Sequence, residues 1–223
     1  VEQGKVTEFL TGANKLAKGG LTDLTSATNL LTTAQNAYGL SQSDLAHVSD
    51  VLIQTQNKGK VTVNELASCM GKIIPTAKSL GVNMDQLGAG YSIMTAKGIA
   101  SAEATTYMNA MFNELGKSGT KVDGALKQIS GKSFKELTKS GKSTGDILQM
   151  LSDYAQKSGL SLSDLFGSAE AGTAALTLLS GGASEFNNML NTMSNSAGAT
   201  DKAFNEMNAT AQERLTQSFA SLK

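Results

Sequence analysis

The stretch TVNELASCMGKIIPTAKSLGVNMDQLGAGYSIMTAKG, residues Thr62–Gly98, decides the fold class. Its apolar residues recur at steps of three and four, which is the spacing of one buried helical face. Thr62 and Glu65 have the spacing of a capping box, and Gly81 stands where a left-handed residue ends a helix. Asn83 is then placed to cap a second helix. The stretch predicts two helices joined by a tight corner into a rigid helical hairpin.

Pro75, the only proline of the chain, lies inside the first of these two helices. A proline has no N–H group to donate to the carbonyl four residues earlier, which here belongs to Gly71. We therefore expect a kink between Gly71 and Pro75. We interpret this kink as structural, a bend that wraps the helix around a core.

The composition favours a globular helical chain without disulfides. Its 223 residues suffice for one large domain or two small ones. The 19 basic and 19 acidic residues cancel, which removes the usual electrostatic basis for direct binding of nucleic acid or an anionic membrane. Cys69, the single cysteine, is interpreted as a small packed residue. No apolar run approaches the roughly 18 residues that a membrane-spanning helix needs.

Glycines and Ser/Thr–acid pairs divide the rest of the chain into short helices. Glycines follow many apolar-periodic segments, where helix ends favour them: Gly39, Gly59, Gly81, Gly98, Gly131, Gly159 and Gly181. Start signals precede several segments: Ser41 with Asp44, Ser101, Ser133 with Glu136, Ser143, and Ser161 with Asp164. We therefore predict an all-α fold, a compact bundle of short helical hairpins.

Three regions are predicted along the chain. Residues 1–20 are weakly patterned, with a short helix ending at Gly19–Gly20, and form a connecting segment; residues 21–200 form the helical core domain. Residues 201–223 carry a narrow apolar stripe, typical of a coiled-coil seam, made of Phe204, Met207, Ala211, Leu215 and Leu222. This stripe predicts the start of a longer rod helix or coiled coil. Because the chain begins at Val1 and its last helix has no stop signal, we expect a piece of a longer polypeptide.

Side chains that commonly carry chemistry are present but isolated. His47 is the only histidine, so it is expected to be a surface or half-buried residue rather than a general base. The acid pairs Asp44 with Asp50 and Asp146 with Asp153 lie on predicted helices. There, caps and solvent-facing charges explain the acids better than catalysis does.

Glycine-rich and methionine-rich patterns also predict structure rather than a site. Gly88–Gly90 and Gly181–Ala183 lack the strand, the lysine and the Ser/Thr of a phosphate loop. Seven methionines lie mostly in apolar stripes and are interpreted as core residues: Met70, Met94, Met108, Met111, Met189, Met193 and Met207. We therefore predict no catalytic, cofactor-binding or metal-binding residue, no cofactor, and no enzyme activity.

Five phrases of the sequence resemble the core of tail tape measure proteins from long-tailed bacteriophages and prophages. They extend from about Leu21 to Phe204 and read TSATNLLTTAQNAYGLS, HVSDVLIQTQNKGKVTVNELASCMGKIIPTAKSLGV, MTAKGIASAEATTYMNAMFNEL, GKSFKELTKSGKSTGDILQMLSDYA and LFGSAEAGTAALTLLSGGASEFNNMLNTMSNSAGATDKAF. Their order and spacing carry the resemblance, since no single phrase is a chemical motif. Cys69 and Tyr91 depart from it only by packing-sized substitutions. The family has no catalytic residues in this core to transfer.

The resemblance implies a structural virion protein involved in tail assembly, tail length determination and genome delivery. It implies a location in the tail, in the lumen or at the tip, and in the host cytoplasm during assembly. The implied partners are further copies of the chain and the tail tube, tail tip and tail assembly chaperone proteins. The frequent caps and glycine stops lead to the hypothesis that this core is a compact module beside the ruler.

Two alternatives stay open at this point. The segment could be a helical scaffold or effector module of a longer polypeptide whose enzymatic site, such as a cell-wall hydrolase, lies outside it, because a fold alone never excludes a function. It could also be a cytoplasmic helical scaffold unrelated to phage.

Overall fold

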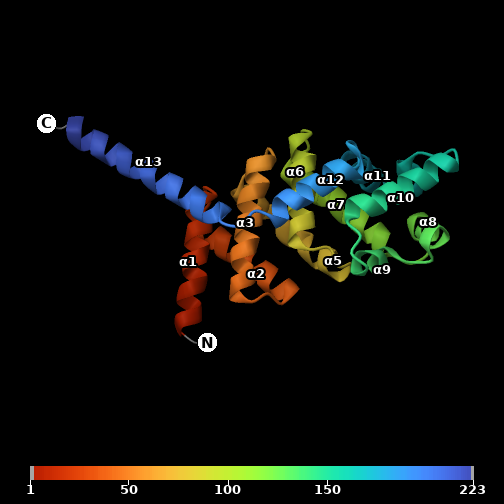
Figure 1. Ribbon diagram of the computed structural model, residues 1–223, viewed down its shortest axis with the longest axis horizontal. Coiled ribbons are helices and arrows are strands. Elements are labelled where there is room, and N and C mark those ends of the chain that lie inside the picture. Colours follow the sequence, from red (N-terminus) through yellow and green to blue (C-terminus); the bar gives the residue numbers. More distant parts are fainter. Residues whose placement is uncertain (1–2, 222–223) are drawn as a thin grey trace.

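A computed structural model describes residues 3–221, and these residues are mainly helical, with no strand among them (Figure 1). The predicted all-α class is confirmed. The elements are α1 (Gln3–Gly19), α2 (Leu24–Tyr38), α3 (Gln42–Lys58), α4 (Val63–Cys69), the 3-10 helix η1 (Met70–Lys72), α5 (Ile74–Ser79), α6 (Met84–Ala96), α7 (Ser101–Gly116), α8 (Lys121–Ser130), α9 (Phe134–Lys139), α10 (Thr144–Lys157), the 3-10 helix η2 (Leu162–Leu165), α11 (Ala169–Leu178), α12 (Gly182–Ser194) and α13 (Ala199–Ser221).

The helices follow one another along an elongated body. α1, α2 and α3 lie at one end, α8, α9 and α10 lie at the other, and α6 and α7 lie between them (Figure 1). In the middle, α6 packs against α3 and α12, and α7 packs against α11. At the first end, α1 packs against α2, α3 and the beginning of α13, so segments from both ends of the chain meet there.

α6 is the central helix of this body, and residues Leu87–Thr95 are buried without exception. A Cβ atom on Gly88 would lie 2.8 Å from Cγ1 of Val51 in α3, and one on Gly90 would lie 2.8 Å from Sδ of Met108 in α7. The two glycines therefore allow neighbouring helices to approach α6 closely. The packing role of these glycines was not predicted from the sequence, which indicated only that they do not form a phosphate loop.

The corner that precedes α6 has the predicted local geometry. Gly81 takes the left-handed conformation, with φ of 81°. The N–H group of Val82 donates to the carbonyl of Ala77 at 3.0 Å, which closes the helix end. Asn83 caps α6 by accepting a hydrogen bond from the backbone of Gln86 at 3.0 Å.

The helices on the two sides of this corner do not lie along each other, so the predicted hairpin is wrong at this place. α4 and α5 pack against α2 and α7, whereas α6 packs chiefly against α3 and α12. The caps determine where each helix begins and ends, but distant packing partners determine its direction.

Pro75 interrupts the first helix of the corner completely rather than kinking it. α4 ends at Cys69, η1 follows, and α5 begins at Ile74 with Pro75 in its first turn. The first turn of a helix leaves its N–H groups without intrahelical partners, so the missing donor of proline costs little there.

Within residues 3–221, five capping boxes are present, at Ser41, Thr62, Ser133, Ser143 and Ser161. At Thr62, the Glu65 carboxylate accepts the backbone N–H at 2.7 Å. The predicted cap at Ser101 is wrong, because the residue before α7 is Ala100 and makes no side-chain capping bond. Ser101 is instead the first, buried residue of that helix.

Two of the seven predicted glycine stops do not take the left-handed conformation. Gly59 has φ of −97°, and Gly181 has φ of −104°. A Cβ atom on Gly59 would lie 2.5 Å from Oγ1 of Thr95 and 3.1 Å from Cα of Ser92. Glycine is required at 59 because α6 passes close to it, and not because of its backbone angles.

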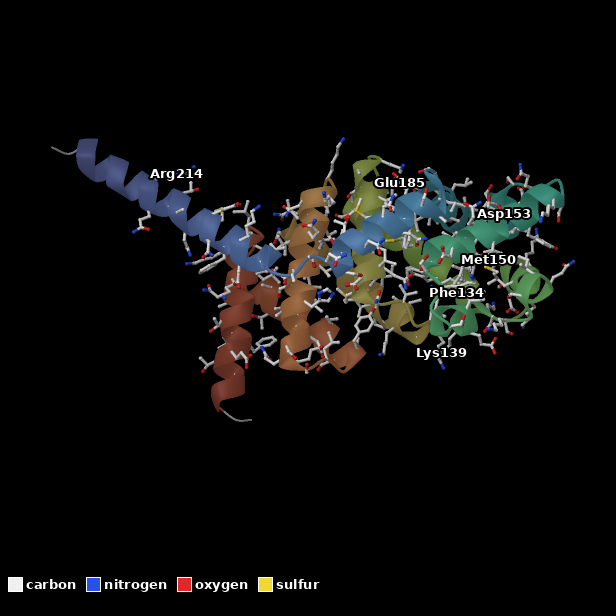
Figure 2. All side chains as sticks on the ribbon, in the orientation of Figure 1. Phe134, Lys139, Met150, Asp153, Glu185 and Arg214 are labelled. Atoms are coloured by element: carbon white, nitrogen blue, oxygen red, sulfur yellow. The ribbon has the colours of Figure 1, made fainter. Side chains whose placement is uncertain are left out.

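α13 is the longest helix among residues 3–221, with 23 residues, and most of it projects away from the body (Figure 1). It packs against α1 and α3 near its start. Figure 2 shows Arg214 on the projecting part. The rod or coiled coil that this helix would begin stays a prediction, since the side chain of Leu215 and all of Leu222 lie outside the described part.

The methionine interpretation is confirmed for six of the seven residues. Met70, Met94, Met108, Met111 and Met193 are buried, and Met189 packs against the core. It is wrong for Met207 of α13, which is 38% exposed.

Candidate functional site

A groove of about 680 Å³ separates the N-terminal halves of α1 and α3. α1 contributes small and hydroxyl-bearing residues, among them Thr7, Thr11 and Gly12, and α3 contributes Ala46 and Ser49. Apolar side chains of Phe9, Leu31 and Leu45 also line it, and the beginning of α13 closes one end with Gly198, Thr200 and Asp201. The groove therefore lies where the projecting helix joins the body.

Asp50 of α3 holds the base of α13 at the closed end of the groove. Its two carboxylate oxygens accept backbone hydrogen bonds from Gly198, at 2.9 Å, and from Thr200, at 2.8 Å. Asp50 is only 8% exposed. The first N–H groups of a helix have no intrahelical acceptor, and the helix dipole favours negative charge near them. The carboxylate thus acts as a cap supplied by another helix, and we call this contact the Asp50 clamp.

Two hydroxyl groups near the clamp lack hydrogen-bond partners in the described part of the chain. They are Oγ of Ser196 and Oγ1 of Thr200, and Thr200 is 6% exposed. Buried polar groups in proteins are nearly always hydrogen-bonded. Thr200 also lines the groove, so its hydroxyl offers a polar contact there.

α1 and α13 cross beside the groove and contact each other there. Lys15 and Asp201 form an ion pair at 2.7 Å. A Cβ atom on Gly19 would lie 3.0 Å from Cβ of Ala203, so the two helices touch where that glycine sits. The ammonium group of Lys18 lies 5.5 Å from the ring centroid of Phe204, within cation–π range.

His47 belongs to a small polar cluster outside the groove. Its Nε2 atom lies 2.7 Å from Oδ1 of Asp85, and the Ser194 hydroxyl donates to Oδ2 of the same carboxylate at 3.0 Å. A nucleophilic triad needs the hydroxyl on the imidazole, whereas here both groups bind the acid. The cluster joins α3, α6 and α12, and it matches the expected half-buried histidine.

The acid pairs noted in the sequence do not come together as sites. Asp44 caps its own helix, and a hydrogen bond from the Ser41 hydroxyl holds the pKa of its carboxyl below the ordinary value. Asp153 accepts a bond from Gln149 on the same helix.

Asp146 has a structural role as well. Burial opposes its ionisation, but hydrogen bonds from Asn187 and Ser143 outweigh this effect and lower the pKa of the carboxyl. The bonds with Ser143 cap the start of α10, and the bond from Asn187 joins it to α12, so this acid serves as a helix cap and a bridge between helices.

Cys69 is buried, as interpreted from the sequence, and its thiol donates to the carbonyl of Glu65 at 3.1 Å. Among the residues that the structure describes, no group of three or more His, Cys, Asp or Glu side chains is arranged to hold a metal ion. No helix within that part has the length and apolarity needed to cross a membrane.

Neither the groove nor the clamp was predicted from the sequence. Asp50 looks like any other acid on a helix, and its partners lie about 150 positions further along the chain. A signal existed only in the small residues of α1, Gly4 and Gly12, which leave open space beside the helix.

Comparison with known proteins gives the family. Residues 1–156 match the family described as phage-related minor tail protein. Over 230 residues, the chain is 37% identical to a probable tape measure protein of Clostridium phage phiCD119. That match covers 99% of this chain and 24% of the relative, so the chain spans about a quarter of the relative's length. No solved structure is significantly similar to it. The resemblance to tape measure proteins is thus confirmed, and the chain belongs to the phage-related minor tail protein family.

Proposed function

We propose that this chain is a compact structural module of a tail tape measure protein. It would be located in the tail lumen or at the tail tip and in the host cytoplasm during assembly, and it would take part in tail assembly, tail length determination and genome delivery. The observation that carries the proposal is the Asp50 clamp, by which a body of short packed helices holds the base of one long projecting helix. Membership of a tail protein family supports the general role.

The module is better suited to anchoring than to measuring. As one unbroken helix, 223 residues would extend over roughly 330 Å, at about 1.5 Å per residue. The chain folds back on itself instead, so that α1 packs against the beginning of α13. Most of its residues therefore add no length along a tail.

We propose that partners bind at the groove beside the Asp50 clamp. The groove offers apolar side chains, small residues and the unpaired Thr200 hydroxyl at the place where α13 leaves the body. The partners would be further copies of the chain or tail tube, tail tip and assembly chaperone proteins.

An in-frame deletion in the full-length phage protein tests the module. Removal of residues 101–180 should prevent tail formation or give misassembled tails. The deletion removes α7 and α11, which pack against α6. A ruler segment would instead give regular tails about 120 Å shorter, at about 1.5 Å per residue. Electron microscopy of the particles distinguishes the two results, and proportionally shortened tails would refute the proposal. A deletion of equal length elsewhere in the full-length protein is the control.

A second arm of this experiment fills the groove without deleting anything. Gly12→Leu should keep the helix content of the chain, since a Cβ atom at Gly12 meets nothing within 4 Å. It should reduce the yield of complete tails. Gly71→Leu is the matched control, because Gly71 is exposed, does not line the groove, and a Cβ atom there would meet only Cγ2 of Thr33, at 3.9 Å. Equal yields from the two variants would exclude the groove as a docking place.

A further inference from the structure

Positive charge is concentrated in one short region of this neutral chain. Residues 117–142 contain seven lysines and two acids, a net charge of +5. The other 197 residues contain 12 basic and 17 acidic residues, a net charge of −5. We call residues 117–142 the lysine lobe; it comprises α8, α9 and the corners beside them, at the end of the body opposite α1 (Figure 1).

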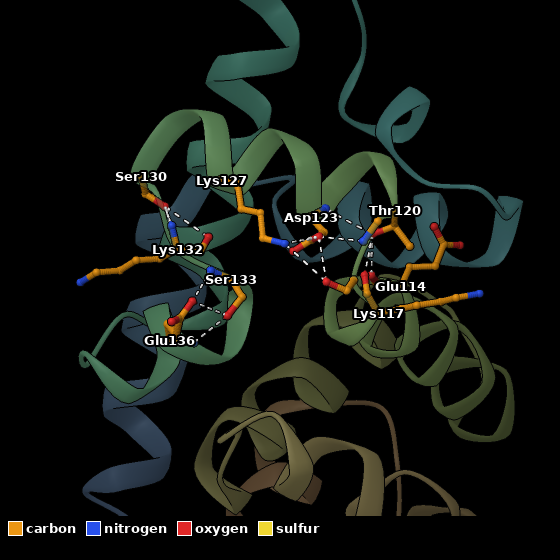
Figure 3. A network of polar contacts seen from close by, with 11 residues as sticks. Glu114, Lys117, Thr120, Asp123, Lys127, Ser130, Lys132, Ser133 and Glu136 are labelled. Carbon is orange, nitrogen blue, oxygen red and sulfur yellow. Dashed lines mark hydrogen bonds and ion pairs between the residues drawn. The ribbon is translucent and has the colours of Figure 1, made fainter.

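Both acids of the lysine lobe are already engaged in local structure. Asp123 accepts hydrogen bonds from Lys127, at 2.8 Å, and from the backbone of Gly119, at 2.8 Å. Glu136 accepts the backbone N–H of Ser133 at 2.7 Å, in a capping box (Figure 3). Asp123 forms an ion pair with Lys127, and Glu136 forms no ion pair with a lysine of the lobe among the described side chains.

All seven lysines of the lobe are exposed. Among the residues with described side chains, the ammonium groups of five of them form neither an ion pair nor a hydrogen bond: Lys117, Lys132, Lys135, Lys139 and Lys142. Lys121 forms no ion pair but donates to the backbone carbonyl of Asp164 at 3.4 Å. In Figure 3, Lys132 points away from the capping network, and Figure 2 shows Lys139 at the outer side of α9. Their ammonium groups are free to meet an anionic partner.

Two corners of the lobe have the same design. Ser130–Ser133 and Ser140–Ser143 both read SGKS, and the glycines at 131 and 141 are left-handed, with φ of 70° and 90°. In each corner the chain turns at glycine, presents an exposed lysine, and then caps the next helix with serine. The repetition places Lys132 and Lys142 at equivalent positions before α9 and α10.

We propose that the lysine lobe binds the phosphate backbone of double-stranded DNA without regard to sequence. Lysine is a compact charge suited to phosphate contact, and several such contacts release counterions from the duplex. The lobe has no arginine, and its single aromatic residue, Phe134, is buried. It therefore lacks the planar guanidinium fork that pairs with guanine edges and an exposed ring that could stack on single-stranded bases.

A membrane surface suits the lobe less well than a duplex does. Lipid-binding helices insert an apolar face among the acyl chains. Here the apolar faces of α8 and α9 are turned inward: Val122, Leu126, Phe134 and Leu137 are buried, and only Ile129, at 38%, is partly accessible. The sequence analysis expected no direct binding of nucleic acid, because the overall net charge is zero. That value is the sum of +5 in the lysine lobe and −5 in the other residues, so it conceals the positive charge of the lobe.

Fluorescence anisotropy of the purified 223-residue chain with labelled 30-base-pair duplexes tests the proposal. Two unrelated sequences should bind equally well. The logarithm of the affinity should fall with the logarithm of salt concentration with a slope of about −3 to −5, since each neutralised phosphate contributes about −0.9. Undetectable binding at 50 mM salt, or strong preference for one sequence, would overturn it.

Matched variants separate the lobe from general charge effects. Lys132→Gln with Lys142→Gln should weaken binding about tenfold and make the slope shallower by about 2, the contribution of two phosphate contacts. Lys58→Gln with Lys72→Gln removes the same charge from exposed positions outside the lobe and should change affinity less than twofold. Equal losses in the two pairs would refute the assignment. Binding to phosphatidylglycerol vesicles but not to duplexes would refute it in favour of a membrane.

Discussion

The Asp50 side chain connects the middle of α3 with the first turn of α13. Both of its oxygens are used, each by a different backbone N–H group, so rotation of the carboxylate would break at least one bond. These N–H groups belong to a helix start, where an unsatisfied donor is costly once it is buried. Together with the contacts of α13 with α1, this residue holds the start of the longest described helix against the body.

Replacing this carboxylate should loosen the base of α13. Asp50→Ala should lower the free energy of unfolding by about 1–3 kcal/mol, because it leaves two helix-start donors without their acceptor. Urea denaturation followed by circular dichroism measures the change. Asp153→Ala is the control, since Asp153 is exposed and binds only Gln149 on its own helix. Its effect should stay within about 0.5 kcal/mol, and equal effects would mean that the clamp adds no stability.

Residue-level features were predictable where the partners are neighbours in sequence. Ser133 and Glu136 lie three positions apart, and any helix start with these residues can form the same box. Asp50 and Thr200 are separated by 150 positions, and nothing in either local pattern indicates the other. The long-range cap and the groove beside it therefore had to come from the fold.

Helix α6 illustrates how elements are placed in this molecule. It has neighbours on several sides, and its small residues determine how near they come. Sequence periodicity identified α6 correctly but gave it the wrong neighbour, because an apolar stripe states only that a face is buried. The same limit applies to Pro75, where the residue predicted a disturbance but not a complete break.

Alanine substitutions at two helical glycines should have opposite effects. Gly88→Ala should destabilise the chain by about 1–3 kcal/mol, because the new methyl group meets Val51 and Thr55 inside the core. Gly124→Ala should stabilise it by up to about 1 kcal/mol, because Gly124 faces open space and alanine is the better helix former. Thermal denaturation compares the two variants with the parent chain. A stabilising Gly88→Ala would show that α3 and α6 are not closely packed.

At the scale of the whole molecule, the carboxylates in helix caps make the free energy of unfolding depend on pH. Hydrogen bonds from neighbouring hydroxyl and backbone groups lower the pKa of the carboxyls of Asp23, Asp44 and Asp164 below the ordinary value of 3.8. Backbone and hydroxyl bonds from Ser133 do the same for the pKa of Glu136. A carboxyl whose pKa is lower in the folded than in the unfolded state favours folding while it is ionised.

We therefore expect stability to be constant near neutral pH and to decline under acid conditions. The contribution of these carboxyls is complete above the unfolded pKa of about 4 and disappears as the pH falls through the lower folded values. Urea midpoints measured from pH 7 to pH 3 test this. Ser133→Ala removes a donor to Glu136 and should make the decline shallower. A chain that becomes more stable between pH 5 and pH 3 would contradict the expectation.

The crossing of α1 and α13 also determines how the molecule would respond to tension. The two helices touch where Gly19 lies against Ala203, and both are held at the same end of the body. A pull applied through them in opposite directions would load this crossing and the Asp50 clamp first. Helices α4–α12 would carry no force until α13 had separated from α3. The molecule should therefore yield in steps, releasing its outer pair of helices well before its interior.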